Sequence, residues 1–155
     1  MLAFFSFYHK ILLINMKIEC INNKIIVYVY QYLLNINEIK ELHNEIKRIF
    51  LKLINSYHFN FFGYNIVNVY QNDNYGCIME IENIYHDSFN NDIIDLKLIV
   101  HQKQDFYLEF NDYLFNEYIK DIIYYNNKYY LNINKIKNIY KYLELGKIVH
   151  KLDFK

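Results

Sequence analysis

Residues 61–82, FFGYNIVNVYQNDNYGCIMEIE, constrain the fold of this chain more than any other segment. Residues 64–71 and 75–82 are two runs of strand length. In the second run, Cys77, Met79 and Ile81 alternate with Ile78, Glu80 and Glu82, which is typical of a strand with one buried face and one wetter face. Gly76 stands at the turn between the two runs and Gly63 just before the first, where only Gly or Asn adopts a positive φ at little cost. The segment therefore predicts an antiparallel hairpin whose glycines serve backbone geometry and not a ligand.

A second hairpin and a helix are predicted on the amino-terminal side of this segment. Residues 16–30, MKIECINNKIIVYVY, indicate two strands around Asn22 and Asn23, since both asparagines tolerate the left-handed conformation of a tight turn. Asn35 or Asn37 can then cap a helix. Apolar residues recur along that helix at spacings of three and four, as on one buried face: Ile36, Ile39, Leu42, Ile46, Ile49, Phe50, Leu53 and Ile54.

The carboxy-terminal half predicts a second set of strands and helices. In chain order these are a strand over 94–100, a strand over 106–110, a short helix over 111–120, a hairpin that turns at Asn126–Asn127, a helix over 134–146 and a last strand over 147–152. This order of elements predicts an α+β fold with two small lobes of mostly antiparallel sheet, each covered by helix.

The boundary between the lobes is predicted from polar residues without periodicity over 83–92. We therefore expect a strand–helix–hairpin lobe over 16–83 and an α+β lobe over 93–155. The apolar residues 1–15 are too short to cross a bilayer and lack the basic start and small-residue cleavage site of a secretory signal. They are interpreted as a start-site artefact or a peripheral extension, with a membrane anchor as the lesser alternative.

Composition excludes some classes of protein and favours others. The hydrophobic fraction of 54% excludes a disordered chain. Two cysteines without CxxC spacing favour a reducing compartment, so a cytoplasmic location is expected. Residues 73–127 carry eleven acidic and three basic residues although the whole chain is neutral, which is typical of lobes that attract each other or of an acidic face for a basic partner. The abundance of Tyr and Asn is interpreted as AT-rich codon drift and carries little functional weight.

No catalytic, metal or cofactor site is predicted. Three glycines at 63, 76 and 146 cannot form a Walker loop or a dinucleotide fingerprint. The serines and cysteines show no nucleophile motif, and a hydrolase that uses Cys77 has none to support it. A zinc site could be assembled in space, but its residues lack ligand spacing: Cys20, Cys77, His58 and His101. The sequence therefore predicts a protein that is not an enzyme.

A nucleic-acid binder is the alternative of a different class, because exposed aromatic residues on a small sheet can stack bases. The candidate residues would be Tyr28, Tyr30, Tyr64, Tyr70, Tyr129 and Tyr130. One arginine and a net charge of zero leave little attraction for phosphates. Only lysines after residue 134 form a modest basic surface, so nucleic-acid binding is the second choice.

The order of elements resembles a known family. MKIECINNKIIVYVY, a helix, and FFGYNIVNVYQNDNYGCIMEIEN resemble the amino-terminal domain of the MecA-type adaptor proteins. FYLEFNDYLFNEYI, IIYYNNKYYLNIN and IYKYLELGKIV are similar to that family's carboxy-terminal domain. The likeness covers most of residues 16–150, although the long acidic linker of the family is absent.

The resemblance implies a non-enzymatic adaptor with two roles. One lobe would hold a client protein, and the other would dock on a Clp-type AAA+ unfoldase. The docking surface implied by position comprises Phe110, Asp112, Phe115, Glu117, Tyr129 and Tyr130. Exposed Tyr and Phe on a small sheet suit protein contacts, and the alternative is that the same residues are core. Aromatic residues ringed by Asp112, Glu117 and Asp121 would favour a protein partner, and aromatic residues beside the tail lysines would favour nucleic acid.

Overall fold

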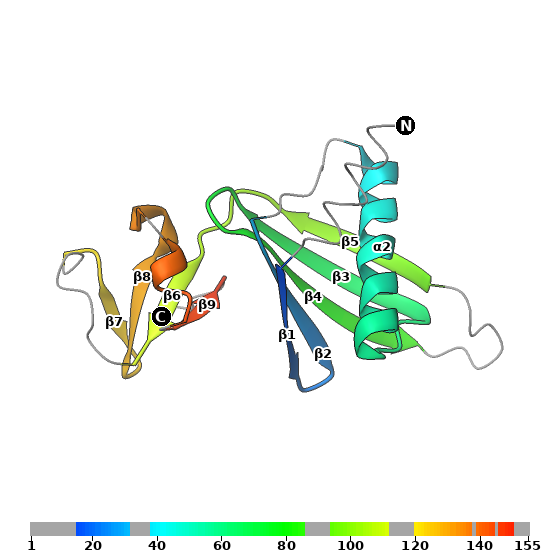
Figure 1. The fold of residues 1–155 in the computed structure, drawn as a ribbon, viewed down its shortest axis with the longest axis horizontal. Coiled ribbons are helices and arrows are strands. Elements are labelled where there is room, and N and C mark those ends of the chain that lie inside the picture. Colours follow the sequence, from blue (N-terminus) through cyan, green and yellow to red (C-terminus); the bar gives the residue numbers. More distant parts are fainter. Residues whose placement is uncertain are drawn as a thin grey trace.

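The computed structural model describes residues 15–31, 38–85, 94–111, 120–137, 139–144 and 146–150, which form two sheets and one α-helix (Figure 1). The elements are β1 (Asn15–Ile21), β2 (Lys24–Tyr30), α2 (Ile39–Tyr57), β3 (Gly63–Asn72), β4 (Gly76–Tyr85), β5 (Ile94–His101), β6 (Tyr107–Phe110), β7 (Ile123–Tyr125), β8 (Lys128–Asn132), the 3₁₀ turns η2 (Ile133–Lys135) and η3 (Ile139–Lys141), and β9 (Lys147–Val149). This is an α+β arrangement dominated by sheet. Apart from Asn15, the segment 1–15 lies outside the described residues.

The first sheet has five strands in the order β1-β2-β4-β3-β5. The hairpin predicted over 61–82 is confirmed as β3 and β4, which pair antiparallel with Val69 opposite Met79. Gly63 and Gly76 have φ values of 97° and 131°, the left-handed region in which a side chain is strained. Asn22 has a φ of 55° at the predicted β1–β2 turn. Local turn chemistry thus determined both hairpins of this sheet.

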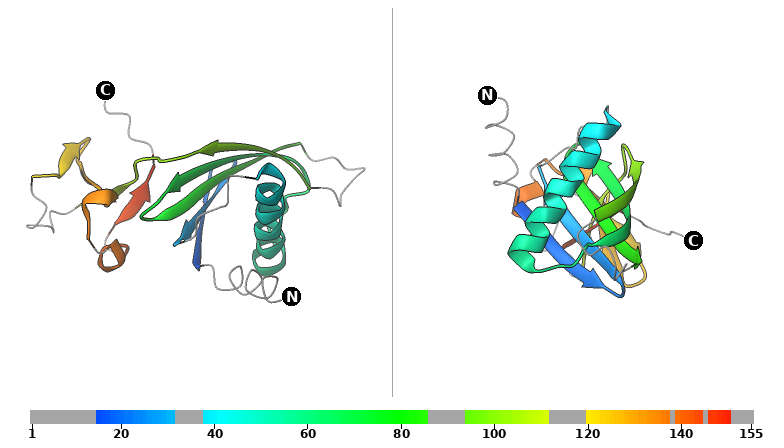
Figure 2. Two further views of the ribbon diagram at one scale, coloured as in Figure 1. Left: turned by 90° about the horizontal axis from the view of Figure 1, so that it is seen from above. Right: turned by 90° about the vertical axis from the view of Figure 1, so that its right-hand side faces the viewer.

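Helix α2 covers one face of the five-stranded sheet, as the two views of Figure 2 show. It begins at Ile39, and Glu38 at its N-cap makes no side-chain capping hydrogen bond. The predicted capping residues, Asn35 and Asn37, lie outside the described residues. The helix and the sheet enclose a largely aliphatic core of buried residues: Val27, Val29, Leu42, Ile46, Ile49, Phe50, Leu53, Phe61, Val67, Val69, Cys77, Met79 and Ile81.

Strand β5 belongs to the five-stranded sheet, although its residues follow the predicted boundary over 83–92 and were expected in the carboxy-terminal lobe. It pairs in parallel with β3, with Leu98 opposite Val67. Its alternate apolar residues, among them Leu96 and Val100, pack against the core under α2. A parallel partner needs a connection that crosses over, and local sequence does not reveal which strand such a connection reaches. The chain enters the second sheet only at Tyr107.

The second sheet has four strands in the order β7-β8-β6-β9. The α-helix predicted over 134–146 is wrong, because the described residues of that range form η2, η3 and turns. Ile133, Ile136 and Ile139 are all buried. Ile136 has an extended backbone between η2 and η3, so these are two separate turns. Of the described residues, only those of the first sheet are covered by an α-helix. Residues 112–119 of the predicted short helix lie outside the described part.

The two sheets share a second, aromatic-rich core. The face of the first sheet opposite α2 contributes Tyr28, Tyr70 and Ile78, which pack with residues of the second sheet such as Leu108 and Leu131. One end of the first sheet is therefore buried on both faces. No helix in the described part of the chain has the length and apolar character needed to cross a membrane.

Candidate protein-binding surface

The β7–β8 hairpin turns at Asn126 and Asn127, as predicted. Their φ values are 51° and 62°, and Tyr125 pairs with Lys128 across the two-residue turn. Two successive left-handed residues define the turn that best matches the twist of a hairpin, and Asn adopts that conformation more easily than other non-glycine residues. The asparagines therefore hold the short strand β7 at the edge of the sheet.

This hairpin carries exposed aromatic side chains. Ile123, Tyr124 and Tyr125 are 39%, 60% and 37% exposed. The rings of Tyr124 and Tyr129 lie 5.0 Å apart between centroids, and the Tyr124 hydroxyl donates a hydrogen bond of 3.1 Å to Asn127 Oδ1. We call Ile123, Tyr124, Tyr125 and Tyr129 the aromatic strip. Because side chains alternate along a strand, Tyr124 and Tyr129 lie on one face of this sheet edge, and Ile123 and Tyr125 lie on the other.

The aromatic strip is anchored to the second core. Tyr129 is half-buried, and its ring stacks on Phe110 with centroids 5.6 Å apart and an angle of 19° between the planes. Phe110 itself is only 3% exposed. Contacts between stacked rings restrict side-chain motion, so the outer ring of Tyr124 extends a rigid row of aromatic residues. A partner that binds there meets a surface with little side-chain entropy left to lose.

The structure separates the six residues implied by the family resemblance into three groups. Phe110 and Tyr130 are buried, at 3% and 6% exposed, so for these two the core alternative holds. Tyr129 is part of the aromatic strip. Asp112, Phe115 and Glu117 lie outside the described residues.

Sequence reasoning missed Ile123, Tyr124 and Tyr125. The run IIYYNNKYY has similar residues on both sides of its turn. Periodicity alone could not show that β7 is an edge strand whereas β8 lies between two neighbours. The short length of the apolar run before the turn was the one available signal, since edge strands are often short.

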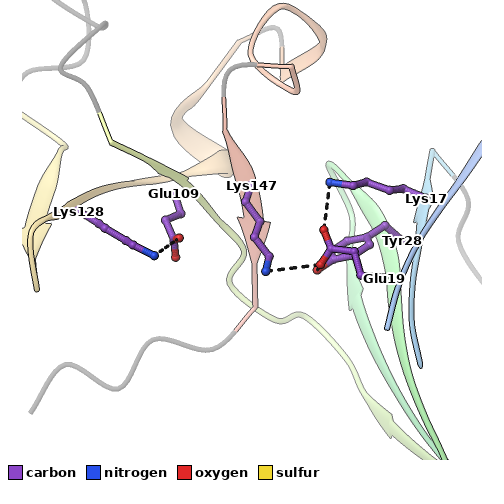
Figure 3. Close-up of polar contacts among 6 residues, drawn as sticks. All are labelled: Lys17, Glu19, Tyr28, Glu109, Lys128 and Lys147. Carbon is purple, nitrogen blue, oxygen red and sulfur yellow. Dashed lines mark hydrogen bonds and ion pairs between the residues drawn. The ribbon is translucent and has the colours of Figure 1, made fainter. Parts of the chain in front are cut away.

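Two lysines beside the hairpin are paired with carboxylates. Lys128 Nζ lies 2.8 Å from Glu109 Oε1 (Figure 3), and Lys135 Nζ lies 2.9 Å from Asp121 Oδ1. The hydrogen bond to Glu109 and the charge of that carboxylate raise the pKa of Lys128. These two ion pairs lower the positive electrostatic potential near the aromatic residues. A nucleic-acid backbone would therefore be attracted less strongly to this surface.

The proposed base-stacking tyrosines do not form one exposed surface. Tyr28 and Tyr70 are 6% and 4% exposed and lie in the second core. Tyr64 is 39% exposed, but it lies on β3 of the other sheet. Base stacking requires exposed ring faces. The burial of Tyr28 and Tyr70 therefore weakens the case for nucleic-acid binding.

A set of charged side chains joins the sheets at their junction. Lys17 of β1 and Lys147 of β9 both approach Glu19, at 3.2 Å and 3.5 Å, and the Tyr28 hydroxyl donates to the same carboxylate (Figure 3). Burial alone would raise the pKa of Glu19, but the hydrogen bonds and positive charges outweigh it and lower the pKa. Glu19 therefore stays ionised and holds one lysine from each sheet.

The reactive side chains in the described residues are dispersed. Cys77 lies in the core under α2, where burial and the charge of Glu45 raise the pKa of its thiol to about 12, so it is not a nucleophile at neutral pH. Cys20 is exposed on the edge strand β1. His150 Nε2 lies 2.9 Å from Glu80 Oε1, but without hydrogen-bond geometry. Tyr70 packs on that imidazole with ring centroids 3.9 Å apart.

The described residues contain no group of three or more His, Cys, Asp or Glu side chains placed to hold a metal ion. Comparisons with protein-family models, with curated proteins and with solved structures found no match for this chain.

Proposed function

We propose that this chain is a non-enzymatic protein–protein interaction module that binds a partner protein through the aromatic strip. The observation that carries the proposal is an exposed edge strand with aromatic side chains whose neighbouring lysines are already paired with carboxylates. Aromatic side chains are enriched at the energetic centres of protein interfaces, whereas charged residues are depleted there. A neutralised aromatic surface is suited to such a contact.

The sheet edge adds a second means of contact. Strand β7 is the last strand of its sheet, so in the described part of the chain no strand pairs with its outer side. A segment of a partner in extended conformation could hydrogen-bond to this edge while its side chains contact Tyr124 or Ile123. Main-chain bonds would supply affinity and the aromatic strip specificity.

The resemblance to the MecA-type adaptors suggests which partner to test first. In this proposal the second sheet docks on a Clp-type AAA+ unfoldase, and the first sheet holds a client protein in the cytoplasm. The aromatic strip lies on the hairpin that resembles the family's carboxy-terminal hairpin, and this correspondence supports assigning the unfoldase to the second sheet.

The test is a binding titration between the full chain and a purified Clp-type unfoldase. Tyr124→Ala is expected to weaken binding by about tenfold or more, as loss of an aromatic side chain at the centre of an interface does. Tyr57→Ala is the matched control, because Tyr57 is 49% exposed at the end of α2, away from the second sheet. It should leave the affinity unchanged.

Two results would contradict the proposal. Equal losses for Tyr124→Ala and Tyr57→Ala would exclude the aromatic strip as the contact. Salt-dependent binding of single-stranded RNA that is lost in Tyr124→Ala, without any unfoldase binding, would support the nucleic-acid alternative instead.

A further inference from the structure

We propose that a cavity at the junction of the two sheets binds a small aromatic carboxylate, a ligand with one planar ring and one negative charge. The cavity has a volume of about 130 Å³. Its lining residues are Lys17, Tyr28, Tyr30, Tyr75, Leu143, Gly146, Lys147 and Ile148. This site is separate from the aromatic strip, and the proposal does not depend on the function proposed above.

The walls of this junction cavity suit a flat ring. Tyr28 and Tyr75 are 6% and 5% exposed, and the rings of Tyr30 and Tyr75 lie 5.4 Å apart between centroids. Leu143 and Ile148 complete the wall from the second half of the chain. An apolar cavity of about 150 Å³ accommodates benzene. The junction cavity is slightly smaller, at about 130 Å³, but it is partly open to solvent, so it holds at most a single ring whose charged group extends beyond the walls.

The two lysines give the junction cavity a positive charge. Lys17 and Lys147 approach Glu19 from opposite sheets (Figure 3), so two ammonium groups face one carboxylate. Each ammonium has three N–H donors, and one contact with Glu19 leaves others for a ligand. The side chains of Lys17 and Lys147 are 66% and 42% exposed, which places these donors on the solvent side of a ring held among the tyrosines.

The hydroxyl of Tyr75 is available to a ligand in the cavity. Tyr75 is 95% buried, since only 5% of its surface is exposed, and its hydroxyl makes no hydrogen bond to another residue within the described ranges. By contrast, the neighbouring Tyr28 hydroxyl donates to Glu19 at 3.2 Å. The oxygen of this hydroxyl is in contact with solvent in the cavity, so water satisfies it when no ligand is bound. A ligand oxygen in the cavity would accept its hydrogen bond.

The first part of the test uses benzoate as the probe, titrated into the full chain and followed by NMR chemical shifts. Benzoate is expected to saturate with shifts at Tyr30, Tyr75 and Ile148. Benzyl alcohol, which has the ring without the charge, should bind at least about threefold more weakly. Acetate, which has the charge without the ring, should not saturate. No saturation by benzoate up to about 10 mM would overturn the proposal, and so would equal binding of benzoate and benzyl alcohol.

Two variants and a matched control locate the site. Lys147→Gln is expected to weaken benzoate binding about threefold or more and to leave benzyl alcohol binding unchanged. Lys128→Gln is the control, because Lys128 is also paired with a glutamate and its side chain is 46% exposed, against 42% for Lys147. An equal loss in both variants would indicate a general charge effect and refute the site.

The second variant separates ligand contact from structural damage. Tyr75→Phe keeps the ring contacts with Tyr30 and Phe106 and removes only the hydroxyl. Benzoate binding should weaken although the melting temperature does not fall. Unchanged benzoate affinity in Tyr75→Phe would exclude the predicted hydrogen bond and, with it, this placement of the ligand.

Discussion

The five-stranded sheet packs an aliphatic core against α2, whereas the four-stranded sheet packs an aromatic-rich core against 3₁₀ turns and the far face of its neighbour. The first core is closed by elements of its own sheet and helix. The second core includes Tyr28, Tyr70 and Ile78, which all belong to the first sheet. The core of the second sheet is therefore completed by residues of the first sheet. The core under α2 depends less on the second sheet.

The largest expected effect is on the free energy of unfolding, and it should differ between two matched leucine-to-alanine variants, one in each core. Leu53 and Leu131 are both 0% exposed, one under α2 and the other in the second core. Leu53→Ala should lower the free energy of unfolding by about 3–5 kcal/mol, because a long helix cannot collapse into the cavity. Leu131→Ala should cost less, about 2–3 kcal/mol, because short turns can relax around it. Urea unfolding measures both values.

The same two variants test the proposed dependence. Leu53→Ala should shift the unfolding of both sheets, whereas Leu131→Ala should loosen the second sheet more than the first. Hydrogen exchange resolves the two regions. Equal protection losses in both sheets for Leu131→Ala would show that the two cores unfold as one unit and that the comparison fails.

A smaller effect is expected where β9 approaches β6. A Cβ atom on Gly146 would lie 2.5 Å from the Glu109 carbonyl oxygen and 3.0 Å from Leu108 Cδ1. Since the first of these is a backbone atom, Gly146→Ala must displace β9, at a cost of about 1–3 kcal/mol. Thermal unfolding measures the loss. A melting temperature equal to that of the unaltered chain would mean that the second sheet accommodates the shift without strain.

The smallest effect concerns the charged contacts between the sheets. The pKa of Glu19 is lowered below its ordinary value of 4.5 when the chain is folded. As the pH falls, the unfolded chain binds the proton first, so this contribution is complete above about pH 4.5 and is lost as the pH falls through the folded pKa. Glu19→Gln should therefore remove part of the acid dependence and cost up to about 1 kcal/mol at neutral pH.

The matched control for this variant is Glu109→Gln, whose lysine partner lies within the second sheet. Glu19→Gln should change both the benzoate-induced shifts and the hydrogen exchange at the junction. Glu109→Gln should change neither. An acid unfolding curve that is the same for Glu19→Gln and the unaltered chain would contradict the role of Glu19 as a link between the sheets.

Local signals predicted much of the fold. The hairpin over 61–82, the asparagine turns at 22–23 and 126–127 and most of the buried face of α2 were confirmed within the described residues. Ile39, which was predicted on that face, is 75% exposed at the start of the helix. Each of these features depends on neighbours in the chain. The α-helix over 134–146 was predicted from the spacing of Ile136, Ile139, Tyr140 and Leu143, and it was wrong. Ile136 is extended between η2 and η3, and apolar spacing over so few residues does not separate a helix from consecutive turns.

The candidate sites were less predictable, since exposure depends on which elements meet. Phe110 and Tyr130 are core residues and Tyr124 is exposed, although all three lie in similar aromatic runs. Lys17 and Lys147 both line the junction cavity although they are 130 positions apart in the sequence. No spacing rule relates such distant residues.

By itself, the sequence determined where this chain turns, which residues alternate and where a helix can bury one face, because turn propensity and periodicity are properties of neighbouring residues. The tertiary structure decided that β5 joins the first sheet, that β7 is an edge strand, and that lysines of two sheets meet at Glu19. Those outcomes depend on which surfaces exclude water from one another, and that choice involves residues far apart in the chain.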